Sequence, residues 1–201
     1  MSEERVVQIL EAAYQCFKRH GVRRTTMDDI AAEAGMSRPA VYQYVRNKDD
    51  VTRRLVQKIL AENLHQAAEV GSSIRPLEAK LLGILAAKLE LTLRLYRESP
   101  HAAEMLDVNA RLFGDLVQGH HQELAALLTR VVTDAVARGE ADLGGGTDAG
   151  TVAEIALALL RGLEADLGDL ELPHRRLRDA VRLLARGLAP RVGTPWSAAR
   201  L

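Results

Sequence analysis

Aromatic side chains and cysteine are both scarce in this chain of 201 residues. Phe, Trp and Tyr make up 3% of it, and β-branched residues are sparse beside Ala and Leu, a balance that favours helices over sheets. The one cysteine, Cys16, excludes an intramolecular disulfide and fits a reducing cytoplasm. The composition therefore predicts an all-α protein located in the cytoplasm, with Cys16 as inert core.

An excess of either charge is also lacking, because 27 Lys and Arg side chains balance 27 Asp and Glu side chains. Residues 1–50 are balanced as well, so any DNA-binding surface depends on the placement of basic side chains and not on their number. The longest strongly apolar stretch, Val152–Leu163, contains Glu154 and Arg161 and is too short to span a bilayer. The first residues are acidic and then amphipathic, so we expect no signal peptide and no membrane partner.

Apolar residues recur with the period of an α-helix along most of the chain. The first such stretch runs to about His20 and stops at Gly21, a residue that is typical just past a helix end. Further helices are expected over about 27–34, 38–45, 48–70, 75–97, 101–113, 115–138, 148–167 and 173–192. Gly71, Ser72 and Ser73 are expected to break the chain between the fourth and fifth helices. No segment has the pattern of a strand.

Three polar residues mark the starts of the second, third and fourth helices. Thr26 is followed three residues later by Asp29, which completes a pattern like a capping box. Ser37 is a good N-cap for the third helix, and Pro39 is tolerated in its first turn. Asn47, with Asp50 three residues on, caps the fourth. The caps thus define two short helices joined by a turn that contains glycine.

This pair of short helices has the arrangement of a helix-turn-helix. Apolar contact between the two helices is expected from Ile30 and Ala31 on one side and Val41 and Val45 on the other. The opposite face of the third helix carries side chains that can read DNA: Arg38, Tyr42, Gln43 and Tyr44. Arg favours guanine and Gln favours adenine through paired hydrogen bonds, while Tyr hydroxyls and a Lys ammonium suit phosphates. The pattern predicts a helix that enters the major groove of double-stranded DNA.

The first 60 residues or so resemble the tetracycline-repressor (TetR) family. The resemblance rests on a first helix that ends in FKRHG, followed by TTMDDIAAEAGMSRPAVYQYVRNKDDV. It implies an all-helical repressor with a C-terminal domain that binds a small molecule and forms a homodimer. Phosphate contacts are implied for Thr26, Tyr42 and Lys48, and base or backbone contacts for Arg38, Pro39, Ala40, Gln43 and Tyr44. With Ser37, these complete the candidate DNA-binding residues; Ala40 departs from the small polar residue often found there.

The expected organisation is an N-terminal helix-turn-helix domain over 1–47, with its reading motif at about 25–45. It is followed by a helical ligand-binding and dimerisation domain over 48–192. The chain ends in a tail over 193–201, which contains Trp196. The expected function is a regulator released from a near-palindromic operator by a small-molecule effector. Two alternatives remain open, a nonspecific DNA-binding protein and a helical carrier or enzyme. The second has little support, because a nucleophile elbow, metal-ligand spacing and a phosphate-binding loop are all lacking.

The last two helices are the candidates for the dimer interface. The final helix has an apolar stripe, and the helix before it is apolar on more than one face, so that one face can serve a partner. Pairing both helices across a two-fold axis would form a four-helix interface, although the stripes can also be intrachain core. The interface candidates are Ile155, Leu159, Leu163, Leu177, Val181, Leu184 and Leu188.

The central helices are the candidates for an effector site, because ligand pockets are mostly apolar with a few polar groups. The candidate lining residues are Leu85, Leu89, Thr92, Tyr96, His101, Met105, Asn109, Phe113, Val117, His121 and Leu124. Apolar residues at helical spacing more often pack in the hydrophobic core than line a ligand site. The adjacent His120 and His121 point about 100° apart on a helix and cannot chelate one ion together, so no metal and no other cofactor is expected.

Overall fold

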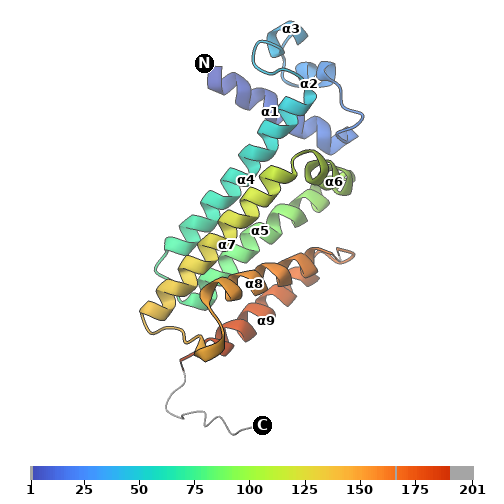
Figure 1. Cartoon of the computed structure of the whole chain (residues 1–201). Helices are drawn as coiled ribbons and strands as arrows, with labels where there is room; N and C mark the ends of the chain where they lie inside the picture. The colour runs from blue at the N-terminus through green and yellow to red at the C-terminus, as the bar shows by residue number, and fades with distance from the viewer. Residues whose placement is uncertain (1, 166, 191–201) are drawn as a thin grey trace. The chain divides into compact units, whose positions relative to one another are not determined.

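The structure, a computed structural model, describes residues 2–165 and 167–190, and this part of the chain is helical without strands (Figure 1). The all-α prediction is confirmed. Trp196 and the predicted tail lie outside the described residues. The elements are α1 (Ser2–His20), α2 (Met27–Glu33), α3 (Arg38–Val41), α4 (Lys48–Ser72), α5 (Leu77–Glu98), α6 (Ala102–Leu112), α7 (Gly114–Ala137), a 3₁₀ turn η1 (Gly144–Gly146), α8 (Ala149–Glu164) and α9 (Leu172–Gly187).

The chain forms two compact units. The first comprises Met1–Gln66 and Lys88–Glu123, and the second comprises Ala67–Ala87 and Leu124–Leu201. Helices α4, α5 and α7 therefore each contribute residues to both units. The predicted domain boundary between residues 47 and 48 stays a prediction.

The core of the first unit joins α1, α2, α3 and α6. Phe17 of α1, Ile30 of α2 and Val41 of α3 are at most 1% exposed. Met105 and Val108 of α6 belong to the same cluster of buried side chains. The two short helices are thus held by apolar burial against α1 and α6, because helices of this length are not stable alone.

Two glycines allow close helix packing in the second unit. A Cβ atom on Gly71 of α4 would lie 3.0 Å from Leu127 of α7, and one on Gly83 of α5 would lie 2.7 Å from Val70 of α4. The expected break at Gly71–Ser73 is therefore wrong in position, because α4 continues through Gly71 to Ser72. Gly71 serves the approach of two helices and not the end of one.

The third helix is shorter than expected and ends at Val41 instead of near Val45. After Val41 the backbone turns with bonds between residues three apart: Gln43 N–H donates to Ala40 O at 3.2 Å, and Tyr44 N–H donates to Val41 O at 3.0 Å. These tighter bonds, beside one of α-helical spacing from Val45 N–H to Val41 O at 3.2 Å, make this segment an irregular turn. Tyr42, Gln43 and Tyr44 therefore lie in a turn that extends α3 and not in a regular helix.

Candidate nucleic-acid interface

All three predicted caps are formed by side chains. Thr26 Oγ1 accepts a hydrogen bond from Asp29 N–H at 3.2 Å, while Asp29 Oδ2 accepts one from Thr26 N–H at 2.8 Å, which completes the capping box. Ser37 Oγ accepts from Ala40 N–H at 3.3 Å, and Asn47 Oδ1 accepts from Asp50 N–H at 2.8 Å. The hydrogen bonds from the Thr26 side chain and backbone lower the pKa of the Asp29 carboxyl. The start of each helix is thereby fixed.

The turn between α2 and α3 is set by Gly35. Its φ of +62° is in the left-handed region that favours glycine, and it lets Met36 N–H donate to Ala31 O at 2.9 Å. Ile30, Ala31, Val41 and Val45 are at most 3% exposed, as the sequence predicts for the contact between the helices. Burial of these residues orients the opposite face of α3 outward.

The outward face carries most of the predicted DNA-binding side chains. Thr26, Ser37, Arg38, Pro39, Tyr42 and Gln43 are exposed, while Ala40, Tyr44 and Lys48 are half-buried. Tyr42 is 41% exposed, and the Arg38 guanidinium carbon lies 5.6 Å from the centre of its ring. The Arg38 Nη1 atom also lies 2.9 Å from Asp28 Oδ2. The face is therefore aromatic and cationic, with an acid beside it.

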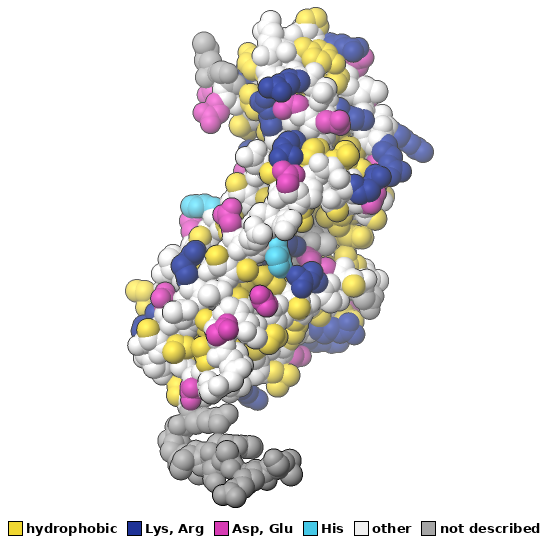
Figure 2. Space-filling model, in the orientation of Figure 1, with side chains coloured by type: hydrophobic (Ala, Val, Ile, Leu, Met, Phe, Trp, Pro, Cys, Tyr) yellow, Lys and Arg dark blue, Asp and Glu magenta, His cyan; other side chains and the backbone are white. Residues whose placement is uncertain are grey.

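The charge around this face is mixed and not of one sign. Figure 2 shows Lys and Arg side chains next to Asp and Glu side chains over the face in view. Asp50 illustrates the pattern, because it accepts bonds from Arg46 N–H and from the Arg54 guanidinium, both at 2.9 Å. Burial raises the pKa of the Asp50 carboxyl, but these two donors outweigh burial and hold the pKa below its usual value. Asp50 is thus kept charged in the first turn of α4.

Lys48 has a role in the fold that the sequence does not reveal. Its ammonium donates to three backbone carbonyls of the segment between α1 and α2: Val22 O at 2.8 Å, Arg23 O at 3.2 Å and Thr25 O at 2.9 Å. An ammonium has three N–H donors, so these contacts use its donor capacity. Lys48 ties the start of α4 to the chain that leads into α2.

The same segment is held from its other side by α6. Arg23 N–H donates to Glu104 Oε1 at 2.8 Å, and the Arg23 guanidinium lies 3.6 Å from Asp107. Gly21 has a φ of +79°, and a Cβ atom there would lie 2.5 Å from Glu104 Oε2. The buried Thr25 hydroxyl closes the segment with a bond to Gly21 O at 2.7 Å. Sequence reasoning assigned no role to Thr25, although the motif includes it, and it missed Glu104, which lies outside the helix-turn-helix pattern.

The predicted effector-site residues are divided between the two units. Leu85 and Leu124 belong to the second unit, and the other nine belong to the first. Leu85, Leu89, Thr92, Met105, Phe113 and Leu124 are buried; Tyr96, His101, Asn109 and His121 are half-buried; Val117 is exposed. In the first unit, the buried His120 Nε2 lies 3.0 Å from Asn63 Oδ1, which is a polar pair between α7 and α4 that the sequence did not single out.

The predicted interface residues on α8 and α9 differ in exposure. Ile155 is 50% exposed, and Leu159, Leu163 and Leu184 are half-buried. Leu177, Val181 and Leu188 are at most 7% exposed within one chain, because α8 and α9 pack against each other. These three residues therefore offer little surface to a partner. Leu183, which the prediction omitted, is 69% exposed.

Within residues 2–165 and 167–190, no group of three His, Cys, Asp or Glu side chains is placed to hold a metal ion. Among the same residues, no helix combines the length and the apolar character needed to cross a membrane. Cys16 is 2% exposed. The desolvation caused by burial raises the pKa of its thiol, as expected for a core cysteine.

Residues 9–55 match the family model described as bacterial regulatory proteins, tetR family. The chain is 31% identical over 172 residues to the HTH-type transcriptional regulator TtgR of Pseudomonas putida, which covers 81% of this chain and 79% of that protein. A TetR transcription regulator from Haloarcula marismortui has the same fold, with a TM-score of 0.74 at 22% identity, over 93% of this chain and 99% of that one. SmeT in complex with triclosan has a TM-score of 0.66 at 21% identity, over 98% of both chains.

Proposed function

Since this chain belongs to the TetR family of bacterial regulatory proteins, we propose that it binds a near-palindromic operator as a homodimer and leaves it when a small molecule binds. The family and its curated members are helix-turn-helix transcriptional regulators, so the chain is a DNA-binding regulator of transcription and not an enzyme. The resemblance noted from residues 17–51 is thus confirmed.

The exposed face of α3 and its following turn reads the DNA. The observation that carries this proposal is Tyr42, an aromatic side chain left 41% exposed between Arg38 and Gln43. Arg38 and Gln43 reach base edges, and Tyr42, Tyr44 and Thr26 contact phosphates. Ser37, Pro39 and Ala40 bring the start of α3 close to the groove, where Ala40 can contact a thymine methyl group.

Lys48 contributes through the fold more than through a direct contact with phosphate. Its three carbonyl partners occupy its ammonium donors, and those carbonyls belong to the segment that leads into Thr26. Lys48 therefore positions the start of α2 on the DNA. Direct binding of its ammonium to phosphate would require the loss of at least one of these bonds.

The dimer forms through the exposed faces of α8 and α9. Ile155 of α8 and Leu183 of α9 are large apolar side chains left in solvent, and the half-buried Leu159, Leu163 and Leu184 belong to the same two helices. A two-fold axis through such a face buries the same residues of both protomers. The dimer also makes twice as many DNA contacts as one chain. The two α3 helices then reach half-sites about 34–36 Å apart, one turn of DNA.

A small molecule controls this dimer by selecting a conformation that does not fit the operator. Family membership supports this step, and SmeT, a relative in fold, is known in complex with triclosan. The buried Leu89, Thr92, Met105 and Phe113 remain the candidate walls of the effector site in the first unit. Helix α4 is continuous from Lys48 to Ser72, so a tilt of α4 would change the spacing of the two reading helices.

Selection of bound fragments from a random pool of DNA tests the proposal. We expect a near-palindromic site, bound about 4–10 kcal/mol more tightly than random DNA. Arg38→Ala and Gln43→Ala should each relax the base preference at one position of each half-site, by about 1–3 kcal/mol. Equal affinity for the selected site and for random DNA would instead indicate a nonspecific DNA-binding protein.

A further inference from the structure

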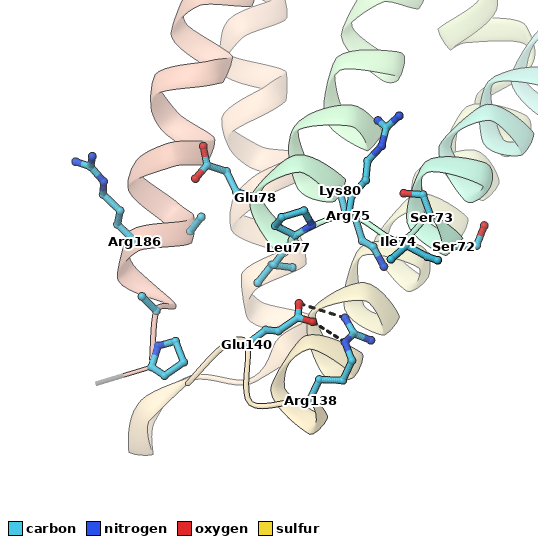
Figure 3. A pocket seen from close by; sticks show the side chains of 14 residues that line it. Ser72, Ser73, Ile74, Arg75, Leu77, Glu78, Lys80, Arg138, Glu140 and Arg186 are labelled. Carbon is cyan, nitrogen blue, oxygen red and sulfur yellow. Dashed lines mark hydrogen bonds and ion pairs between the residues drawn. The ribbon is translucent and has the colours of Figure 1, made fainter. Parts of the chain in front are cut away.

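The second unit contains a cavity with no role in the proposed function. It has a volume of about 1040 Å³ and lies where the turn between α4 and α5, the end of α7 and the end of α9 meet (Figure 3). A volume of this size can hold a small organic ligand. None of the eleven residues proposed for the effector site lines it. It is a second concave surface, and its lining indicates what could bind.

Lys80 of α5 lines the cavity and is only 9% exposed. Its backbone N–H donates to Pro76 O at 3.1 Å, but its ammonium forms no hydrogen bond and no ion pair within 4.0 Å in the described chain. No fully enclosed polar side-chain atom of the described chain lacks a partner, so the Lys80 ammonium, which has none, is not fully enclosed, and Lys80 lines the cavity. A lysine with a buried methylene chain and an ammonium that has no ion pair attracts an anion strongly, because burial weakens the screening of its charge by water.

Glu140, the acid that interacts electrostatically with Lys80, is already paired with Arg138. Glu140 Oε1 accepts a hydrogen bond from Arg138 Nε at 2.8 Å, and its other oxygen accepts from Nη2 at 3.4 Å, a pair drawn as dashed lines in Figure 3. The bond from Arg138 and the positive charges of Arg138 and Lys80 hold the pKa of the Glu140 carboxyl below its usual value. Glu140 is therefore charged and satisfied by Arg138, and it leaves Lys80 without a hydrogen-bonded counter-ion.

The remaining lining combines positive charge with apolar surface. Arg75 and Arg186 add two cations and Glu78 adds one acid, so the lining as a whole carries more positive than negative side chains. Ile74 is fully exposed at the cavity, and Leu77 beside it is 7% exposed. Further apolar lining comes from Pro76, Ala185, Ala189 and Pro190.

We propose that this cavity binds a small organic anion with an apolar body, whose carboxylate pairs with Lys80. The apolar body lies against Ile74 and Leu77, and the acid group replaces the counter-ion that Lys80 lacks. A charged hydrogen bond of this kind is stronger than a neutral one and gives the site its preference for anions. The site is separate from the effector site proposed above, and its existence does not depend on operator binding.

Calorimetric titration of the full chain with octanoate, and with octanol as its neutral counterpart, tests the proposal. Octanoate should bind saturably at one site per chain, and at least tenfold more tightly than octanol. Lys80→Met should weaken octanoate binding at least tenfold and leave octanol binding unchanged. The matched control is Lys58→Met, which removes a lysine paired with Glu62 on the surface of α4 and should change neither ligand.

A second variant keeps the test decisive if Lys80→Met does not fold. Ala189→Trp adds an indole at an exposed lining position and should block octanoate by filling the cavity, without touching Lys80. Octanoate binding that survives both substitutions would overturn the proposal, because it would place the ligand elsewhere. Equal affinity for octanoate and octanol in the unaltered protein would overturn it as well. Operator affinity, measured separately, reports on the proposed function alone.

Discussion

The Lys48 ammonium lies 2.8 Å from the carbonyl oxygen of Val22, and this contact joins the first turn of α4 to the segment between α1 and α2. Two further carbonyls of the same segment share the ammonium. The two residues are 26 positions apart in the sequence, and their contact holds the segment that leads into α2 against the start of α4.

Lys48→Met should destabilise the protein, because it leaves three carbonyls without their donor. We expect a loss of about 1–3 kcal/mol in the free energy of unfolding, measured by urea denaturation. Affinity for operator and random DNA should fall together, while the slope of log affinity against log salt stays the same. A slope reduced by about one, with unchanged stability, would instead make Lys48 a direct phosphate ligand.

Gly21→Ala should cost more stability than Gly35→Ala. Both glycines have a positive φ, so both substitutions carry the backbone cost of about 1–2 kcal/mol. A Cβ atom on Gly35 meets open space, whereas one on Gly21 displaces the Glu104 carboxylate that accepts the Arg23 N–H bond. The difference between the two melting temperatures therefore measures how much the contact of Glu104 with the segment after α1 stabilises the protein. Equal losses would show that this contact contributes nothing.

Asp28→Asn should raise affinity for random DNA. In the free protein Asp28 holds the Arg38 guanidinium at 2.9 Å, and its removal frees that cation for phosphate. We expect fluorescence anisotropy to show tighter binding at low salt and a steeper salt dependence. In an Arg38→Ala background the same substitution should have little effect. A gain of equal size in both backgrounds would contradict a role for the ion pair.

Ile155→Glu should weaken the proposed dimer. The side chain is half-exposed on α8, so the substitution places a charge on the face proposed for the partner without disturbing the chain's own core. Sedimentation velocity should show monomers at concentrations where the unaltered chain is dimeric. Leu112→Glu, at a similarly exposed apolar position on α6, is the control and should remain dimeric.

Acid should destabilise the protein through His120. Burial, with the charges of Lys88 and His121, lowers its pKa to about 4, whereas an unfolded chain takes up the proton near pH 6.5. The unfolded state thus binds more protons between these values, so stability falls as the pH drops from about 6.5 through 4. The loss is up to about 3 kcal/mol. His120→Gln should remove this dependence, and His65→Gln, at an exposed site, should not.

The sequence predicted the features that depend on neighbours along the chain. The caps at Thr26, Ser37 and Asn47 each join residues three apart, so their pattern is visible in the printed letters. The helical spacing of apolar residues likewise predicted the burial of Ile30 and Val41. Local hydrogen bonding and periodicity need no knowledge of the rest of the fold.

Features that depend on distant residues could not be predicted. The carbonyl partners of Lys48 and the contact of Glu104 with the segment after α1 join residues between 23 and 81 positions apart. Gly71 was expected to end a helix, because nothing near it in the sequence indicates that α7 packs against it. The stripe on α9 indicated an apolar face, but not that two of its residues, Leu177 and Val181, are already buried within one chain.

The Arg38–Asp28 pair has a consequence for how the protein searches a genome. Asp28 occupies the guanidinium in the way that a phosphate oxygen would, so each encounter with DNA exchanges one anion for another. Such an exchange gains little on an arbitrary sequence, where only phosphates are offered, and gains more where a base edge adds its own hydrogen bonds. We expect short dwell times on arbitrary DNA and a larger share of molecules free to find the operator.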